Sequence, residues 1–204
     1  MDLSRRYNKA LTQHPLVTKA LTGAILSSLG ELISQLSTGV VSREGQSTLK
    51  RVRGVLKIVA RQPSKILLMF CYGGLINAPI NHYLYGWITK YTNSKIVNVT
   101  LRRLLQLLAS LLIVSPIQVG FLVSSLTVVN QNVGWALAKY PPMIKQNLRT
   151  KYFKILSSSW VTSTILVSIA QKYVEPAKWS VFFSFAYAIL ATGQNIYLKS
   201  VSGK

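Results

Sequence analysis

Long stretches without a charged side chain constrain this chain more than any other feature of its sequence. Residues 66–89 and 104–138 form runs of 24 and 35 residues that contain no Lys, Arg, Asp or Glu. A helix needs about 20 predominantly apolar residues to cross the hydrocarbon core of a bilayer. Each run can therefore span a membrane. The second run is too long for one ordinary span, and we expect its helix to end near Asn130.

Three further segments are candidate spans. Two uncharged runs near the C-terminus are separated by a charged turn, and either or both are expected to cross. A segment near the N-terminus carries Lys19, whose side chain can extend to the headgroups, and Glu31 near its other end. The candidate spans are residues 16–36, 66–89, 104–130, 155–171 and 179–198. The sequence predicts an all-α transmembrane helix bundle of about four spans, or five if both C-terminal runs cross.

The composition leaves little polar surface for a soluble protein. Of the 204 residues, 14% are charged, whereas soluble domains carry about 25%, and the mean hydropathy is positive. Only four acidic residues stand against 24 Lys and Arg, for a net charge of +20. We treat residues 1–204 as a single integral membrane domain, because neither a repeat nor a change of composition divides them.

The excess of basic residues could also indicate a nucleic-acid-binding protein. Such a protein would interleave Lys and Arg with aromatic residues on one face and keep a polar surface elsewhere. Here the basic residues gather in three predicted linkers, Leu36–Lys65, Lys90–Arg103 and Lys139–Lys154. In that position they anchor helices to anionic headgroups. We therefore expect the lipid bilayer, and no nucleic acid, as a partner. Because both sides of the membrane would receive similar charge, no orientation is predicted.

Small and polar residues form stripes along three of the predicted spans. The first stripe is Gly23, Ser27, Gly30 and Ser34, with Glu31 and Gln35 beside it. The second is Gly74, Asn77, Asn81 and Tyr85, with His82 beside it, and the third is Ser184, Ala188, Ala191 and Asn195. Small residues let helices approach closely in lipid, so each stripe could be a dry packing seam. Alternatively, the same faces could line a hydrated path, where amides and hydroxyls replace water around a polar solute.

Three residues inside the predicted spans carry an energetic cost. An ionised side chain such as that of Glu31 costs about 2.5–3.5 kcal/mol at membrane depth on insertion scales, so it faces the bundle interior or water, or pairs with a Lys or Arg of another segment. Pro79 and Pro116 each remove an intrahelical hydrogen bond and predict helix kinks, which would free the carbonyls of Leu75 and Leu112.

The sequence contains no pattern that supports catalysis. It has no Gly-rich phosphate loop, no His, Cys or carboxylate cluster with metal-ligand spacing, and no set of Ser, His and acid. We therefore expect no enzymatic activity, no metal and no cofactor. An enzyme of lipid metabolism would need a convergent nucleophile and base that the spacing does not provide.

Several blocks of the sequence together resemble one known family. The matching residues are Tyr7, Leu11, His14-Pro15, Val17-Thr18-Lys19, Gly23, Leu29-Gly30-Glu31, Ser34-Gln35, Ala78-Pro79, His82-Tyr83-Leu84-Tyr85, the apolar run Leu107–Pro116, and Tyr140-Pro141 with Asn147. They resemble the peroxisomal membrane protein 2 family, which also contains Mpv-type mitochondrial inner-membrane proteins. The chain departs from the family pattern at Ala78 in place of Gly, at Ser110 in place of Asp, and at Lys151-Tyr152 in place of Trp-Pro.

The resemblance implies an all-helical, multi-pass protein of the peroxisomal membrane, or alternatively of the mitochondrial inner membrane. It implies a weakly selective pore for small water-soluble solutes, without a cofactor. A non-conducting membrane scaffold is the alternative function. We also expect a homo-oligomer, with small polar solutes as partners if the protein is a channel.

Overall fold

The computed structural model describes residues 3–40, 57, 63–130, 137–173 and 179–202. Helices account for nearly all of these residues and no strand occurs among them, so the predicted all-α class is confirmed. The α-helices are α1 (Leu3–Gln13), α2 (Pro15–Val40), α4 (Pro63–Cys71), α5 (Ala78–Lys95), α6 (Val99–Ala109), α7 (Ser115–Asn130), α8 (Tyr140–Tyr173) and α9 (Trp179–Ser202). Two π-helical segments, η1 (Tyr72–Asn77) and η2 (Ser110–Val114), and the short 3-10 turn η3 (Leu137–Lys139) complete them.

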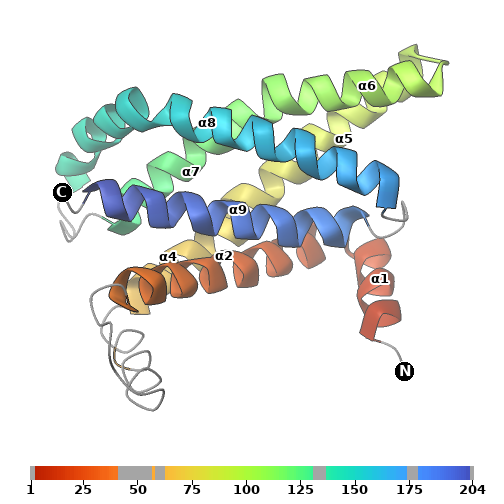
Figure 1. Cartoon of the computed structure of the whole chain (residues 1–204). Coiled ribbons are helices and arrows are strands. Elements are labelled where there is room, and N and C mark those ends of the chain that lie inside the picture. Colours follow the sequence, from red (N-terminus) through yellow and green to blue (C-terminus); the bar gives the residue numbers. More distant parts are fainter. Residues whose placement is uncertain (1–2, 41–56, 58–62, 131–136, 174–178, 203–204) are drawn as a thin grey trace.

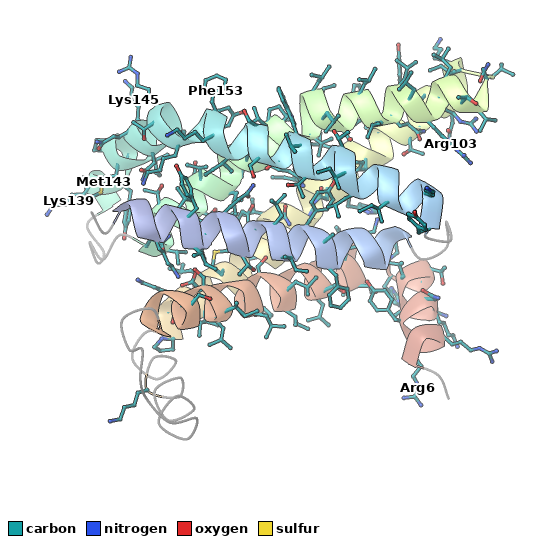
Figure 2. All side chains as sticks on the ribbon, in the orientation of Figure 1. Arg6, Arg103, Lys139, Met143, Lys145 and Phe153 are labelled. Carbon is teal, nitrogen blue, oxygen red and sulfur yellow. The ribbon has the colours of Figure 1, made fainter. Side chains whose placement is uncertain are left out.

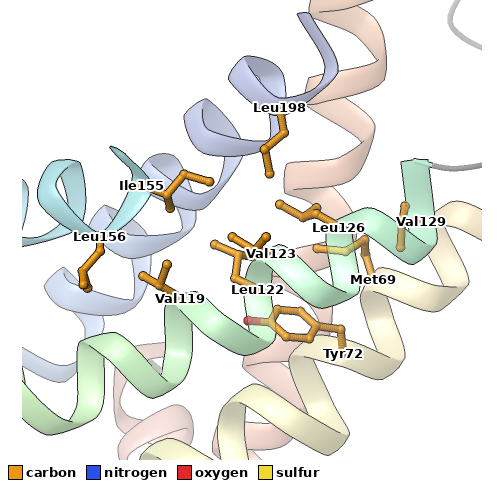
Figure 3. Close-up of a cluster of buried hydrophobic side chains, with 10 residues drawn as sticks. All are labelled: Met69, Tyr72, Val119, Leu122, Val123, Leu126, Val129, Ile155, Leu156 and Leu198. Carbon is orange, nitrogen blue, oxygen red and sulfur yellow. The ribbon is translucent and has the colours of Figure 1, made fainter. Parts of the chain in front are cut away.

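The long helices pack side by side into one bundle (Figure 1). Helix α2 packs against α9 and against η1, while α7 packs against α8. A cluster of buried apolar side chains lies where α4, η1, α7, α8 and α9 meet (Figure 3). Its members are Met69, Tyr72, Val119, Leu122, Val123, Leu126, Val129, Ile155, Leu156 and Leu198.

The outer surface of the bundle is apolar. On α2, large side chains at every fourth position are between 46% and 67% exposed, namely Val17, Leu21, Ile25, Leu29 and Ile33. The opposite face of the same helix buries Glu31, Ser34 and Gln35. A soluble protein places these two kinds of side chain the other way round. In a bilayer, lipid tails cover the exposed stripe and the polar groups find partners inside the bundle.

Two helical stretches among the described residues are long and apolar enough to cross a membrane by length and composition, Pro15–Gln35 and Val99–Asn130. The first matches the predicted span 16–36, and the second contains the predicted span 104–130. Helix α7 is described up to Asn130, and the predicted helix end near this residue borders residues 131–136, which lie outside the described part of the chain. The predicted total of about four spans stays a prediction.

A π-helical segment ends two residues before each of the two prolines that were predicted to kink a helix. Within η2, the amide of Ser115 donates to the carbonyl of Ser110, five residues back, instead of four. In this wider register the carbonyl left without a partner by Pro116 is that of Leu111, one residue before the predicted one. The indole Nε1 of Trp160, on α8, donates to that carbonyl at 2.8 Å. The segment η1 likewise precedes Pro79.

Two of the predicted linkers between spans are largely helical. Within Lys90–Arg103, α5 continues to Lys95 and α6 begins at Val99, so the connection is only three residues long. Within Lys139–Lys154, α8 begins at Tyr140. The predicted spans end where charge begins, whereas the helices extend beyond them. Lys and Arg are good helix formers, and the limit on charge in hydrocarbon does not limit the helix itself.

The third predicted linker, Leu36–Lys65, is helical at both of its ends, because α2 continues to Val40 and α4 begins at Pro63. Residues 41–56 and 58–62 of this linker lie outside the described part of the chain.

Close approaches of α2 to its neighbours depend on glycine. A Cβ atom added to Gly73 would lie 2.2 Å from the carbonyl oxygen of Gly23. Similarly, a Cβ atom added to Gly30 would lie 2.7 Å from the hydroxyl oxygen of Thr192 on α9. Neither contact leaves room for a methyl group, so part of the first polar stripe packs directly against neighbouring helices.

We expect Gly73→Ala to lower the stability of the protein, because its methyl group would collide with backbone atoms of α2. Overpacking typically costs about 1–3 kcal/mol. The matched control is Gly86→Ala on α5, the helix that follows η1 without a break, because no atom lies within 4 Å of a Cβ added to Gly86. Thermal unfolding in detergent should give a lower midpoint for Gly73→Ala only. Equal midpoints for the two variants would contradict the close approach.

Candidate transport cavity

A cavity of about 460 Å³ lies between the helices of the bundle. Its wall receives side chains from α2, α5, α7, α8 and α9, together with the two π-helical segments. Polar side chains from different helices line it, including Ser27, Asn77, Asn81, Gln118, Ser163 and Gln194. The cavity therefore brings amide and hydroxyl groups of several helices into a wall that is otherwise mostly apolar, inside a bundle whose outer surface is apolar.

Most of the predicted stripe residues line this cavity. From the first two stripes they are Gly23, Ser27, Gly30, Glu31, Asn77, Asn81 and Tyr85, and from the third Ala188, Ala191 and Asn195. Ser34 and Gln35 are buried one turn further along α2, outside the lining. Gly74 lies against α2 instead, where an added Cβ would be 3.2 Å from the Cβ of Ala24. His82 also lies outside the lining, and its buried Nδ1 has no hydrogen-bond partner among the described residues.

Three carboxamide side chains meet at one wall of the cavity. Gln118, on α7, donates through Nε2 to the side-chain oxygen of Asn81, and lies 3.5 Å from that of Asn77. Asn81 in turn donates to Asn77 at 3.3 Å. The sequence analysis missed Gln118, although its position two residues after Pro116 within an apolar run was a signal. Polar residues inside such runs are costly unless they meet a partner.

Hydroxyl groups of α8 and amide or phenol groups of α9 form a second polar wall. Gln194 donates through Nε2 to the hydroxyl of Ser159 at 2.8 Å. Tyr187 donates to the hydroxyl of Ser163 at 3.3 Å. None of these four residues was selected from the sequence. The richness of residues 155–171 in Ser and Thr was the available signal, but it does not tell which hydroxyls point inward.

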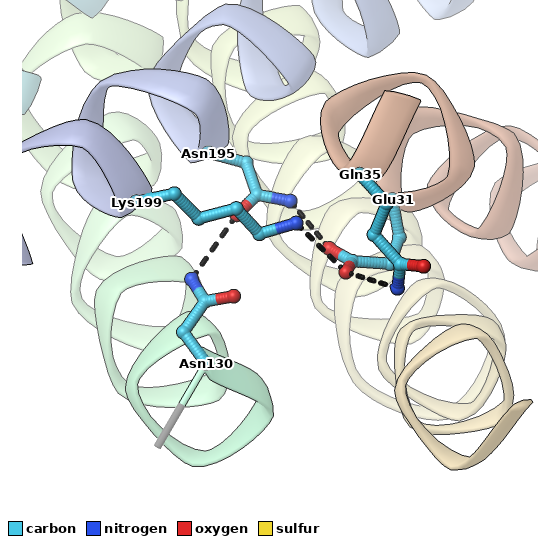
Figure 4. A network of polar contacts seen from close by, with 5 residues as sticks. All are labelled: Glu31, Gln35, Asn130, Asn195 and Lys199. Atoms are coloured by element: carbon cyan, nitrogen blue, oxygen red, sulfur yellow. Dashed lines mark hydrogen bonds and ion pairs between the residues drawn. The ribbon is translucent and has the colours of Figure 1, made fainter. Parts of the chain in front are cut away.

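Glu31 lies at the centre of a buried polar network that joins three helices (Figure 4). Its carboxylate is fully buried and accepts from Lys199 Nζ at 2.9 Å and from Asn195 Nδ2 at 2.6 Å. Gln35 donates to the same carboxylate at 2.8 Å. Asn130, at the end of α7, donates to the side-chain oxygen of Asn195 at 3.2 Å. A charge that would be costly in lipid is thus neutralised and fully hydrogen-bonded inside the bundle.

This network resolves one alternative that the sequence left open for Glu31. The carboxylate contacts the cavity, and it is also paired with a basic residue of another segment. That partner, Lys199, lies 168 positions away in the sequence. Within the described residues, no group of three or more His, Cys, Asp and Glu is placed to hold a metal ion.

We expect Glu31→Ala to be strongly destabilising, because it leaves the buried ammonium of Lys199 and two amides without an acceptor. Breaking a buried ion pair from one side typically costs about 3–5 kcal/mol. The double variant Glu31→Ala/Lys199→Met should recover part of this loss, since it removes the unpaired charge. Thermal unfolding of the wild type, both single variants and the double variant measures the coupling. If the stability losses of the two single variants simply add up to the loss of the double variant, the result would contradict a direct interaction between the two side chains.

Comparisons with known proteins identify relatives across most of the chain. A Woronin body membrane protein of Aspergillus fumigatus is 29% identical over 194 residues, which make up 95% of this chain and 75% of the relative. A Woronin sorting complex protein of Neurospora crassa is 29% identical over 95% of this chain, but only 56% of that relative is covered. Peroxisomal membrane protein 2 of Bos taurus is 26% identical over 92% of this chain and 87% of its own length.

No family model matches the chain. No solved structure matches it either. The relatives nevertheless include peroxisomal membrane proteins of an animal and of a plant, which confirms both the resemblance and the peroxisomal location predicted from the sequence. Over most of its length the chain is similar to peroxisomal membrane proteins of the peroxisomal membrane protein 2 type and to a Woronin body membrane protein, and it is an integral protein of the peroxisomal membrane.

Proposed function

We propose that the protein is a weakly selective pore for small water-soluble solutes across the peroxisomal membrane. The observation that carries this proposal is the cavity of about 460 Å³, in whose largely apolar wall amides and hydroxyls of several helices gather, inside helices with apolar outer faces. Such groups can replace the water that a polar solute gives up on leaving solution. The proposal assigns the protein no enzymatic role.

The size and charge of the cavity suggest which solutes would pass. A volume of this order accommodates small organic molecules and leaves no room for a folded protein. Glu31 is neutralised by Lys199, whereas Lys19 also lines the cavity. A positive group in the wall raises the local concentration of anions, so we expect anions to be tolerated at least as well as cations. Reversal potentials in asymmetric salt test this expectation, and a clear cation preference would contradict it.

The number of spans and the oligomeric state belong to the same proposal. Four or five of the long helices would cross the membrane, from within α2, α4–α5, α6–α7, α8 and α9. The cavity is formed by residues of one chain. In a homo-oligomer each copy would therefore carry its own pathway.

Solute flux into liposomes containing the purified protein tests the pore and its wall together. We expect Asn81→Leu and Gln118→Leu each to reduce flux several-fold, since both replace a carboxamide of the wall by an apolar group. Tyr83→Leu is the matched control for Asn81, because Tyr83 is on the same helix but 64% exposed on its outer surface. The amounts of inserted protein must be equal. Wild-type vesicles as tight as empty ones would contradict the pore.

Thiol accessibility tests whether the cavity is hydrated. In a Cys71→Ala background, Ser163→Cys places a thiol on the cavity wall, while Val161→Cys places one on the exposed apolar face of α8. A water-soluble thiol reagent should modify the first much faster than the second in intact proteoliposomes. Modification of neither position would indicate a dry interior.

A membrane scaffold is the second candidate, and two observations favour it. Gly23, Gly30 and Gly73 belong to tight helix contacts, as in a packing seam, and one relative is named a Woronin sorting complex protein. A scaffold would use the bundle as a rigid platform without passing solutes. Tight vesicles together with a protected thiol at position 163 would favour this function over the pore.

A further inference from the structure

Helix α1 is placed differently from the rest of the bundle. In Figure 1, it runs across the direction of α2 and projects to the side, away from the other helices. The bend lies at His14 and Pro15, and a hydrogen bond of 3.0 Å from the Thr18 hydroxyl to the carbonyl of Ala10 holds it. Tyr7 adds a side-chain hydrogen bond of 3.3 Å to Thr22 on α2. Helix α1 is thus fixed to the end of α2.

The two faces of α1 differ in character. Tyr7, Ala10 and Leu11 are partly buried and lie together on one side of the helix. Arg5, Arg6 and Lys9 are exposed on the other, and Arg6 projects away from the bundle in Figure 2. No acidic residue occurs among the residues of α1 that the structure describes. The helix therefore combines an apolar face with a strongly positive one.

The position of α1 relative to lipid follows from the exposed apolar stripe of α2. That stripe begins at Val17, which is 67% exposed and lies only two residues after the bend, and it continues with Leu21. A helix rises about 1.5 Å per residue, so the hydrocarbon boundary lies within a few ångströms of α1. Helix α1 runs across the axis of the bundle near this boundary and projects beyond the other helices. It therefore lies over the lipid that surrounds them.

We propose that α1 is an interfacial helix that binds anionic phospholipid headgroups through Arg5, Arg6 and Lys9. Amphipathic helices with basic polar faces bind in this way, with the apolar face toward the acyl chains and the charges at the headgroups. Charge complementarity selects anionic lipid as the occupant, and the position of α1 next to the exposed apolar stripe of α2 favours a membrane over a soluble acidic partner. Tyr7 also lines the cavity, so the same contact would support one part of its wall.

A fluorescent label on α1 of the full chain tests this proposal. In a Cys71→Ala background, the exposed position Asn8 is changed to Cys and carries a polarity-sensitive fluorophore. The protein is reconstituted in phosphatidylcholine vesicles with or without phosphatidylserine. We expect phosphatidylserine to shift the emission to the blue and to reduce quenching by aqueous acrylamide several-fold. High salt should reverse both changes, because it screens the charges.

The variant Arg5→Gln/Arg6→Gln/Lys9→Gln should lose the response to phosphatidylserine. Its matched control is Lys145→Gln/Arg149→Gln/Lys154→Gln, which removes three exposed basic residues of α8 and should keep the response. Lys9→Gln alone should lose part of it, which provides a test if the triple variant does not fold. The same protection in both lipid mixtures, or a triple variant that responds like the wild type, would overturn the proposal. Solute flux is not measured, so the outcome is independent of the pore.

Discussion

In hydrocarbon, each polar group of a protein must find its partner inside the protein, and the rest of this structure depends on that constraint. The buried carboxylate of Glu31 shows it most directly. Lys199 and Asn195 come to this carboxylate from α9, and Asn130 of α7 contacts Asn195. Because removing any one partner would leave the others unsatisfied in a medium without water, the network ties the positions of three helices together.

The same constraint accounts for the π-helical segments. A proline in a spanning helix leaves a carbonyl without its donor, and here the wider register moves that carbonyl to Leu111, where Trp160 reaches it. Ser110, the first residue of this segment, also lines the cavity. At the other proline, the glycines of η1 let α2 approach to backbone contact. The two π-helical segments are therefore the places where the helices are irregular, where they pack closely against neighbouring helices and where they contribute residues to the cavity wall.

The polar stripes serve two purposes along a single helix. Gly23 and Gly30 bring α2 against η1 and α9, whereas Ser27 between them contributes its hydroxyl to the cavity. The close contacts at the glycines fix the position of α2, and with it the position of the Ser27 side chain in the cavity wall. Seam and lining are thus parts of one arrangement, which is why the sequence pattern alone could not separate them.

The sequence by itself determined the all-α class, the resemblance to peroxisomal membrane proteins and the peroxisomal location. Helical periodicity, uncharged runs and local motifs are properties of neighbouring residues, so they can be read along the chain. It also selected Asn77, Asn81 and Glu31, because polar groups are conspicuous in apolar runs. Only the tertiary structure decided that Lys199 pairs with Glu31 and that Gln118 joins Asn81. Those facts depend on how distant helices rotate and pack, and no spacing between neighbouring residues encodes that.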